Sequence, residues 1–308
     1  MPIKEKSSSF NFPKLAQSLL EGTRNNGSCK LPPGLYLVAT PIGNLGDITL
    51  RGLALLNAAD VIACEDTRVS GLLLKAYGIK KPMMSYHDHN ADERRPDILK
   101  RLAEGQIVVL ISDAGMPCIA DPGFKLVRDC REAGFDVTVI PGANAAVTAM
   151  AASGMPTDTF TFIGFLPSKT GSRKKALEEL KRYPGTLIFY ESPQRLAGCL
   201  DDMVQTLGAE RPAVIARELT KLYEEVRTGS LNDLATLYAT AKPKGEIVIL
   251  VGKSNDTEKT SFDIDALLEE RLKHLSVRDA VAEVVLVTGA SKKDVYARAL
   301  ALDNAKRK

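Results

Sequence analysis

The chain has 308 residues, a net charge of +3 and an isoelectric point near 8.5. Its apolar content of 44% and charged content of 26% are typical of a soluble globular protein, and the length predicts two domains. The cysteines, Cys29, Cys64, Cys118, Cys130 and Cys199, contain no Cys-x-x-Cys pair. This pattern argues against a disulfide framework or a zinc site and fits a reducing cytoplasm. No apolar run reaches the roughly 18 residues of a membrane span, so we expect no membrane partner.

Residues 1–33 are polar and precede the first apolar run. They include Lys4, Lys6 and three consecutive serines, and they lack the apolar core of a signal peptide. We expect a mostly disordered extension, with one or two helical turns around residues 15–20.

Residues 34–155 alternate between short apolar runs and amphipathic stretches. Strands are predicted at 35–39, 61–64, 107–112 and 137–140, and helices at 50–58, 70–77, 94–104, 123–132 and 143–152. Continuous apolar strands separated by helices predict a parallel sheet covered on both faces. Such a sheet binds ligands at the carboxyl ends of its strands.

Residues 156–254 predict a second α/β domain after a turn at 154–157. Its expected strands are 159–165, 186–190, 213–217 and 246–251, with a basic helix at 172–181. A polar break at 255–260 precedes a helical unit, 262–308, with helices at 265–273, 277–287 and 292–302. Ser291 is the expected N-cap of the last helix. This helix–turn–helix-like unit either grips RNA or packs against the body.

Three turns rich in Gly and Pro each join a strand to a helix, at residues 40–46, 111–117 and 140–145. Such turns present backbone N–H groups and a helix N-terminus to a ligand. Neither GxGxxG nor a P-loop is present, and ordinary turns of this kind also collect Gly and Pro. All three lie in one half of the chain, so we expect them to share a single cleft.

Three charged segments are ambiguous from their residues alone. Glu65, Asp66 and Arg68 follow a strand and are either catalytic or a surface ion pair. His87 and His89 have metal-ligand spacing, but with no cysteine or third histidine nearby we expect no metal. The basic stretch from Lys169 to Arg182 either contacts phosphates or is a solvated helix face.

The three turns resemble the S-adenosylmethionine-binding loops of the tetrapyrrole methylase superfamily. Four further segments, residues 65–68, 85–90, 189–193 and 217–221, narrow the resemblance to its ribosomal RNA branch. The resemblance covers roughly residues 34–302. Asp88, Met116, Asn144 and Gln194 stand where that branch commonly has Glu, Thr, Ser and His.

This resemblance implies an α/β, tetrapyrrole-methylase-like fold of two domains, each a sheet flanked by helices, plus a small C-terminal helical unit. It implies S-adenosylmethionine-dependent methylation of the ribose 2′-oxygen of a cytidine in the decoding region of 16S RNA, on the small ribosomal subunit, by a homodimer. The alternatives are C-methylation of a tetrapyrrole on the cobalamin or siroheme route, and a non-catalytic RNA-binding module.

The resemblance also assigns site residues. Catalytic candidates are Glu65, Asp66, Arg68 and His87. Cofactor contacts are implied for Pro41, Gly43, Ser112, Asp113, Gly115, Pro117, Ile119, Ala143, Asn144, Phe189, Tyr190, Leu219 and Gly245. RNA contacts are implied for Asn90 and Lys221, and phosphate contacts are expected for the basic residues Lys169, Arg173, Lys174 and Lys175.

Overall fold

The computed structural model describes residues 31–241, 243–253, 263–288 and 290–306. The chain divides into two compact units, residues 1–253 and 254–308. The first unit holds both predicted sheets, and the second holds the predicted helical unit. The predicted disorder of the N-terminal extension concerns residues that lie outside this description, except for 31–33.

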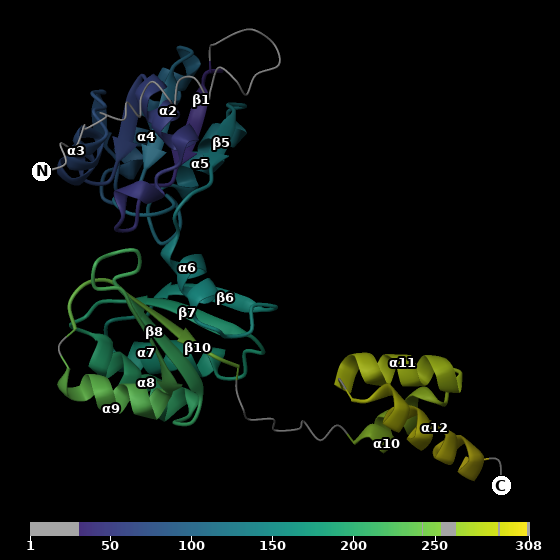
Figure 1. Ribbon diagram of the computed structural model, residues 1–308. Coiled ribbons are helices and arrows are strands. Elements are labelled where there is room, and N and C mark those ends of the chain that lie inside the picture. The colour runs from purple at the N-terminus through teal and green to yellow at the C-terminus, as the bar shows by residue number, and fades with distance from the viewer. Residues whose placement is uncertain (1–30, 242, 254–262, 289, 307–308) are drawn as a thin grey trace, which may run out of the picture. The chain divides into compact units, whose positions relative to one another are not determined.

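The first sheet is parallel throughout, as the sequence predicts, with strand order β3-β2-β4-β1-β5 (Figure 1). Its strands are β1 (Gly34–Val38), β2 (Val61–Cys64), β3 (Met83–Ser85), β4 (Ile107–Ile111) and β5 (Val137–Ile140). Every residue of β1 and β2 is buried, which explains their uninterrupted apolar sequence. Strand β3 is not predicted by the sequence, because three residues give too short a pattern.

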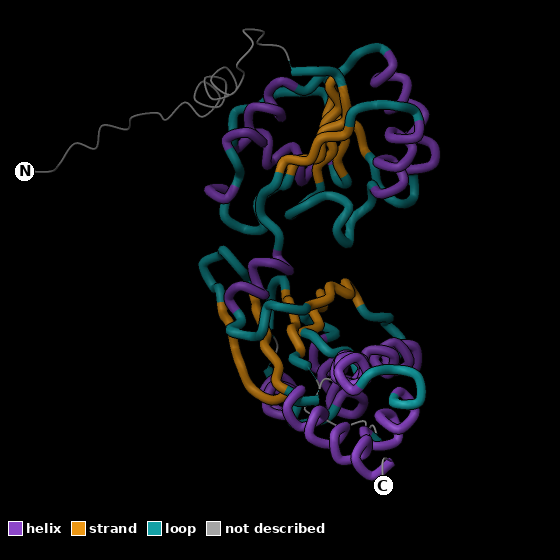
Figure 2. The backbone as a smooth tube through the Cα atoms, turned by 90° about the vertical axis from the view of Figure 1, so that its right-hand side faces the viewer, coloured by secondary structure: helices purple, strands orange, loops and turns teal. Residues whose placement is uncertain are grey.

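Helices cover both faces of this sheet (Figure 2). On one face α2 (Leu50–Ala58) and α3 (Thr67–Ala76) pack over a core that includes Val38, Leu55 and Val109. On the other, α4 (Ala91–Ala103) and α5 (Phe124–Glu132) pack over Leu37 and Leu110. A short 3-10 turn, η1 (Leu45–Asp47), precedes α2. The three predicted turns lie at the carboxyl ends of β1, β4 and β5.

The second sheet is mixed, with strand order β6-β7-β10-β8-β9. Its strands are β6 (Phe160–Phe165), β7 (Thr186–Glu191), β8 (Pro212–Arg217), β9 (Glu225–Ser230) and β10 (Ile247–Val251). Only β6 and β7 pair in parallel. Helices α7 (Thr170–Leu180), α8 (Leu196–Leu207) and α9 (Leu231–Thr240) cover one face, and α6 (Ala145–Ala152) lies on the other.

Three of these elements, α8, β9 and α9, were not predicted. Strand β9 alternates too little, because its Glu-Val-Arg-Thr-Gly-Ser sequence holds one large apolar residue. Helix α9 did carry a readable signal. Ser230 and Asp233 form a capping box, and the buried Leu231, Leu234 and Tyr238 recur at helical spacing.

The second unit consists of α10 (Ile264–Arg271), α11 (Val277–Thr288) and α12 (Lys292–Lys306), which confirms the predicted helical unit. Its core is formed by Leu268, Val281, Val284, Val295 and Ala299. The Ser276 hydroxyl accepts a hydrogen bond from the Asp279 N–H and so caps α11. Among the described residues, no helix is long and apolar enough to span a membrane.

Candidate active site

A cavity of about 370 Å³ lies in the first unit and is lined from both sheets. The first half contributes residues of the three Gly- and Pro-rich turns and of the loop that follows the second turn. The second half contributes the ends of β6, β7 and β8, a residue just after β8, and the start of β10 with the two residues before it. The lining residues are Ile42, Asp113, Ala114, Gly115, Met116, Ile119, Ala120, Asp121, Asn144, Ala145, Phe165, Tyr190, Glu191, Ser192, Pro193, Ala216, Leu219, Gly245, Glu246, Ile247 and Val248.

The three turns contact one another, as the expected common cleft requires. Thr40 and Gly115 exchange two backbone hydrogen bonds of 2.9 and 3.1 Å, and the Thr40 hydroxyl donates to the Ser112 carbonyl. Gly115 has a φ of +83°. A Cβ atom there would stand 3.3 Å from Ile42 of the first turn and 3.7 Å from the Ala143 carbonyl of the third. Gly115 therefore marks the point where all three turns meet at the cavity.

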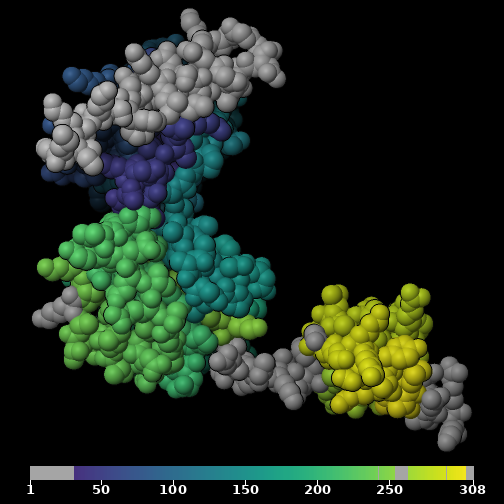
Figure 3. Space-filling view, viewed as in Figure 1, coloured from purple at the N-terminus to yellow at the C-terminus, as the bar shows by residue number. Residues whose placement is uncertain are grey.

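Direct contacts join the two halves of this unit beside the cavity. The Asn44 N–H donates to the Thr220 hydroxyl over 3.1 Å, and the Ala146 N–H donates to the Tyr190 hydroxyl over 3.2 Å. Figure 3 shows the surfaces of the first strand region, in purple, and of the second half, in green, meeting. The apolar cluster around Ile42, Met150 and Leu219 also draws on both halves.

An aromatic pair forms one wall of the cavity. The ring of Tyr190 contacts those of Phe162 and Phe165 edge-on, with centroid separations of 4.8 and 5.6 Å. Gly245, with a φ of +90°, lets the Glu218 carboxylate lie against the backbone, where it accepts from the Glu246 N–H over 3.0 Å. Ring contacts and this hydrogen bond thus hold the wall on the side of the second sheet.

Seven of the residues predicted to bind the cofactor line the cavity: Asp113, Gly115, Ile119, Asn144, Tyr190, Leu219 and Gly245. The other six do not: Pro41, Gly43, Ser112, Pro117, Ala143 and Phe189. Ser112 instead supports the second turn, because its buried hydroxyl donates to the Gly115 carbonyl. Asn144 also caps α6 by accepting from the Val147 N–H.

Two of these predictions are corrected by the packing. Side chains alternate along β7, so Tyr190 faces the cavity while Phe189 is fully buried in the core under α7–α9. At Gly43, a Cβ atom would stand 2.4 Å from the Lys221 side chain. The absence of a side chain at Gly43 therefore lets the first turn lie close to Lys221 of the second half. Gly43 itself does not line the cavity.

None of the predicted catalytic residues lines the cavity. Asp66 and Arg68 form an ion pair with each other, whereas Glu65 is not part of that pair. Asp66 caps α3 and pairs with Arg68 at 2.6 Å, a hydrogen bond that holds the pKa of Asp66 to about 2. The Asp66 carboxylate and the Arg68 guanidinium are thus hydrogen-bonded to each other. Glu65 is half-buried, and burial followed by the repulsion of Asp113 raises its pKa. Glu65 is therefore the carboxylate of this set whose pKa is raised rather than lowered.

His87 and Asn90 lie in the turn that starts α4. The Asn90 side chain accepts from the His87 N–H over 2.8 Å and donates to the Ser85 carbonyl over 3.2 Å. The Nδ1 atom of His87 is buried and makes no hydrogen bond within the described part of the chain. Asn90 thus has a structural task in this turn.

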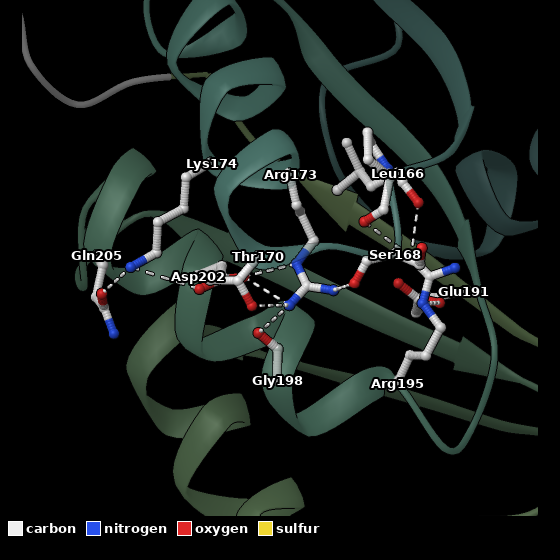
Figure 4. Close-up of polar contacts among 11 residues, drawn as sticks. Leu166, Ser168, Thr170, Arg173, Lys174, Glu191, Arg195, Gly198, Asp202 and Gln205 are labelled. Atoms are coloured by element: carbon white, nitrogen blue, oxygen red, sulfur yellow. Dashed lines mark hydrogen bonds and ion pairs between the residues drawn. The ribbon is translucent and has the colours of Figure 1, made fainter.

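The basic stretch divides according to burial. Lys169 and Lys175 are exposed, and Lys174 is partly engaged with Gln205 at 2.6 Å. The prediction that Arg173 contacts phosphates is wrong, because its guanidinium is buried against Asp202 at 2.6 Å (Figure 4). Lys221 bridges Glu218 and Glu246; burial alone would lower its pKa, but the two carboxylates raise it.

Asp121 is a cavity residue that the sequence analysis missed. Burial and the nearby carboxylates of Glu65, Asp113 and Asp88 raise the pKa of Asp121 to about 6, against a smaller opposing effect of Ser112. Cys118 and Ala120, just before it, have positive φ angles of 72° and 61°. The signal in the sequence was the Asp121-Pro122-Gly123 run, a further turn directly after the second one.

The cavity carries carboxylates but no basic side chain. Asp113, Asp121, Glu191 and Glu246 line it, while no Lys, Arg or His does. Its remaining lining is largely apolar or small. A ligand with a cationic centre and an apolar, planar part fits such a site, whereas a polycarboxylate does not. Among the described residues, no group of three or more His, Cys, Asp or Glu is placed to hold a metal ion.

The family model of the tetrapyrrole (corrin/porphyrin) methylases matches residues 34–235, and that of the RsmI C-terminal HTH domain matches residues 259–303. The ribosomal RNA small subunit methyltransferase I of Mesorhizobium japonicum is 52% identical, with 88% of this chain and 93% of that protein covered. The protein of the same name from Haemophilus influenzae is 46% identical, with 87% and 96% covered.

Solved structures share the fold at low sequence identity. Uroporphyrin-III-C-methyltransferase from Thermus thermophilus has a TM-score of 0.51 and 22% identity, with 72% of this chain and 95% of that one covered. Diphthine synthase has a TM-score of 0.57 and 14% identity, with 71% and 89% covered. The chain therefore belongs to the tetrapyrrole methylase family and, within it, to the ribosomal RNA small subunit methyltransferase I family.

Proposed function

We propose that this chain transfers a methyl group from S-adenosylmethionine to the ribose 2′-oxygen of a cytidine in 16S RNA of the small ribosomal subunit. The observation that carries the proposal is a cavity built from the three strand-end turns, lined by carboxylates and free of basic side chains, in a chain that is 52% identical to a ribosomal RNA small subunit methyltransferase I.

The residues of the cavity fit the cofactor. S-adenosylmethionine supplies the methyl group from a positively charged sulfur. Asp113 and Asp121 offer negative charge to this cation, and Ile42, Ile119 and Leu219 offer apolar contact to the adenine. Gly115 and Gly245 let backbone groups approach the ligand closely. The enclosure excludes water and fixes the orientation of the acceptor, which is the main contribution that a methyl transfer needs.

We assign the remaining proton-handling task to Glu65. A ribose hydroxyl must lose its proton as the new bond forms, and a carboxylate with a raised pKa is suited to accept it. Asp66 and Arg68 hold the start of α3, beside Glu65. The Asp66 N–H donates to the Asp113 carboxylate over 3.3 Å and so ties this segment to the cavity wall.

The tetrapyrrole alternative is less well supported by the comparisons. The cavity would hold S-adenosylmethionine under either reading, but the relatives at 52% and 46% identity are ribosomal RNA small subunit methyltransferases I. The test offers the enzyme labelled S-adenosylmethionine with small ribosomal subunits, with free 16S RNA, or with a uroporphyrinogen. Label in RNA supports the proposal, and label in the tetrapyrrole alone refutes it.

We also propose a cytoplasmic homodimer, as the family resemblance implies. Leu222 and Tyr223 are 88% and 70% exposed on the β8–β9 connection, and large exposed apolar side chains of this kind are typical of contact surfaces. Sedimentation equilibrium tests this assignment directly.

Cofactor affinity should depend on pH through Asp121. Its carboxylate is charged above the pKa of about 6 and attracts the cationic cofactor, so affinity should fall as pH drops through 6. Since one carboxylate binds one proton, affinity below that value should fall by at most about tenfold per pH unit. Calorimetry between pH 5 and 8 measures it. Asp121→Asn should bind more weakly and flatten the profile, whereas Asp97→Asn, at an exposed site, should retain it.

RNA binding should weaken when Lys169 and Lys175 are replaced. The double variant Lys169→Gln/Lys175→Gln should reduce the slope of the logarithm of the RNA-binding constant against the logarithm of the salt concentration by about 1 to 2. Each phosphate contact that is lost lowers the number of counterions released on binding. The control, Lys75→Gln/Lys100→Gln, changes two exposed lysines in the last turns of α3 and α4. Equal slopes for the two variants would mark the basic stretch as a merely solvated face.

A further inference from the structure

Two arginines donate hydrogen bonds to the backbone of the connection between β6 and α7. The Nη2 group of Arg195 donates to the carbonyls of Leu166 and Pro167 over 2.6 and 3.3 Å. The Nη1 group of Arg173 donates to the next carbonyl, that of Ser168, over 3.5 Å. Figure 4 shows both side chains reaching toward this loop, residues 166–168. Three consecutive backbone carbonyls are thus anchored to α7 and to the start of α8.

Each arginine forms an ion pair with a buried carboxylate, but the two pairs differ. Arg173 donates to Asp202 over 2.7 Å and also to the Gly198 carbonyl over 3.2 Å. Arg195 lies 3.2 Å from Glu191, whose side chain is 1% exposed. The buried Nε of Arg195 makes no hydrogen bond in the part of the chain that is described. The Arg195 side chain is 31% exposed, whereas Glu191 is buried, and such a half-buried, incompletely hydrogen-bonded pair is a poor source of stability, which points to a role in positioning.

The segments that Arg195 connects both belong to the cavity wall. Phe165, directly before the anchored loop, lines the cavity although 58% of its surface is exposed. Glu191, Ser192 and Pro193 line it as well. The Ser192 N–H donates to the Glu191 carboxylate over 2.8 Å, so the residue that sets Arg195 also fixes the end of β7. The chain of contacts runs from the β7 end through Glu191 and Arg195 to the loop behind Phe165.

We propose that Arg195 is a positioning residue that fixes loop 166–168, so that Phe165 stands against Tyr190 and closes the cavity on the cofactor. Arg173 and Asp202 form the structural base of the same loop. The inference rests on the proposed function only in taking S-adenosylmethionine as the ligand. The exposed Phe165 ring contacts that of Tyr190 edge-on, with a centroid separation of 5.6 Å, and the fixed backbone follows directly after it.

A double-mutant cycle on cofactor affinity tests this. Arg195→Lys keeps the charge near Glu191, but one ammonium group cannot reproduce the guanidinium's simultaneous reach to a carboxylate and two carbonyls. We expect Arg195→Lys and Phe165→Ala each to raise the Kd for S-adenosylmethionine about tenfold, and the double variant to bind within about twofold of Phe165→Ala alone. Such non-additivity is the result expected when Arg195 acts through Phe165, whereas independent effects would add.

The matched control is Arg211→Lys. Arg211 is buried and, like Arg195, donates to two backbone carbonyls, those of Gly252 and Lys181, but at the opposite end of β10 from the cavity. It should lower the melting temperature without changing the Kd. Additive losses in the cycle, or an unchanged Kd for Arg195→Lys, would overturn the proposal. If Arg195→Lys fails to fold, Glu191→Gln must show the same non-additivity with Phe165→Ala.

Cofactor affinity and methyl transfer are separate readouts. If the wild-type protein binds S-adenosylmethionine but leaves 16S RNA unlabelled, the proposed function fails while the cycle still decides the role of Arg195.

Discussion

Replacing Gly115 with arginine is expected to lower the affinity for S-adenosylmethionine by about 100-fold or more while the protein stays folded. The side chain would start where the three turns meet, 3.3 Å from Ile42, and would extend into the cavity. The backbone hydrogen bonds between Gly115 and Thr40 do not involve a side chain and would persist. Titration calorimetry measures the loss of binding.

Gly134→Arg is the matched control for backbone strain. Gly134 has a φ of +78°, close to the +83° of Gly115, and a Cβ atom there would meet nothing within 4 Å. Both variants place an L-residue in the left-handed region, at a cost of about 1–2 kcal/mol. Only Gly115→Arg should lose binding. Normal affinity in Gly115→Arg would mean that the cofactor binds elsewhere.

Removing the Asp202 carboxylate should destabilise the first unit strongly. Asp202→Ala leaves the Arg173 guanidinium buried without its counter-charge, both side chains being 6% exposed. Breaking a buried pair from one side costs about 3–5 kcal/mol. Replacing both partners, as in Arg173→Met/Asp202→Leu, should recover most of this, because no charge is then left in the interior. Urea unfolding provides the free energies.

The exposed pair Arg94–Asp97 supplies the comparison. Its side chains are 47% and 58% exposed, so Asp97→Ala should change the free energy of unfolding by less than about 1 kcal/mol. A similar small value for Asp202→Ala would contradict the buried-pair account. It would also return Arg173 to the set of residues available for phosphate contacts.

The inner strands of the first sheet could be predicted in detail because they are buried on both faces. Val61–Cys64 appears in the structure with the predicted bounds, since its continuous apolar run leaves little choice of boundary. Val137–Ile140 also has the predicted bounds, although it is an edge strand and only partly buried. Two other edge strands gave weaker signals. Met83–Ser85 is short and half-exposed, and Glu225–Ser230 is polar, so neither stood out from a loop.

The site was predictable where a local pattern determines the geometry. The shared cleft followed from the three strand-end turns, because the carboxyl ends of parallel strands meet at one edge. The direction of a side chain was not predictable. Phe189 and Tyr190 differ by one position and face opposite sides of β7, and Arg173 looks like its exposed neighbours until the position of Asp202, 29 residues later, is known.

The central claim is that the cavity serves methyl transfer to a ribose of 16S RNA. The most direct measurement incubates the protein with labelled S-adenosylmethionine and small ribosomal subunits from cells that lack the enzyme, then identifies the labelled nucleoside by mass spectrometry. Our account predicts 2′-O-methylcytidine, formed by Gly134→Arg and absent with Gly115→Arg. Label on a base, or 2′-O-methylcytidine formed equally by Gly115→Arg, would contradict it.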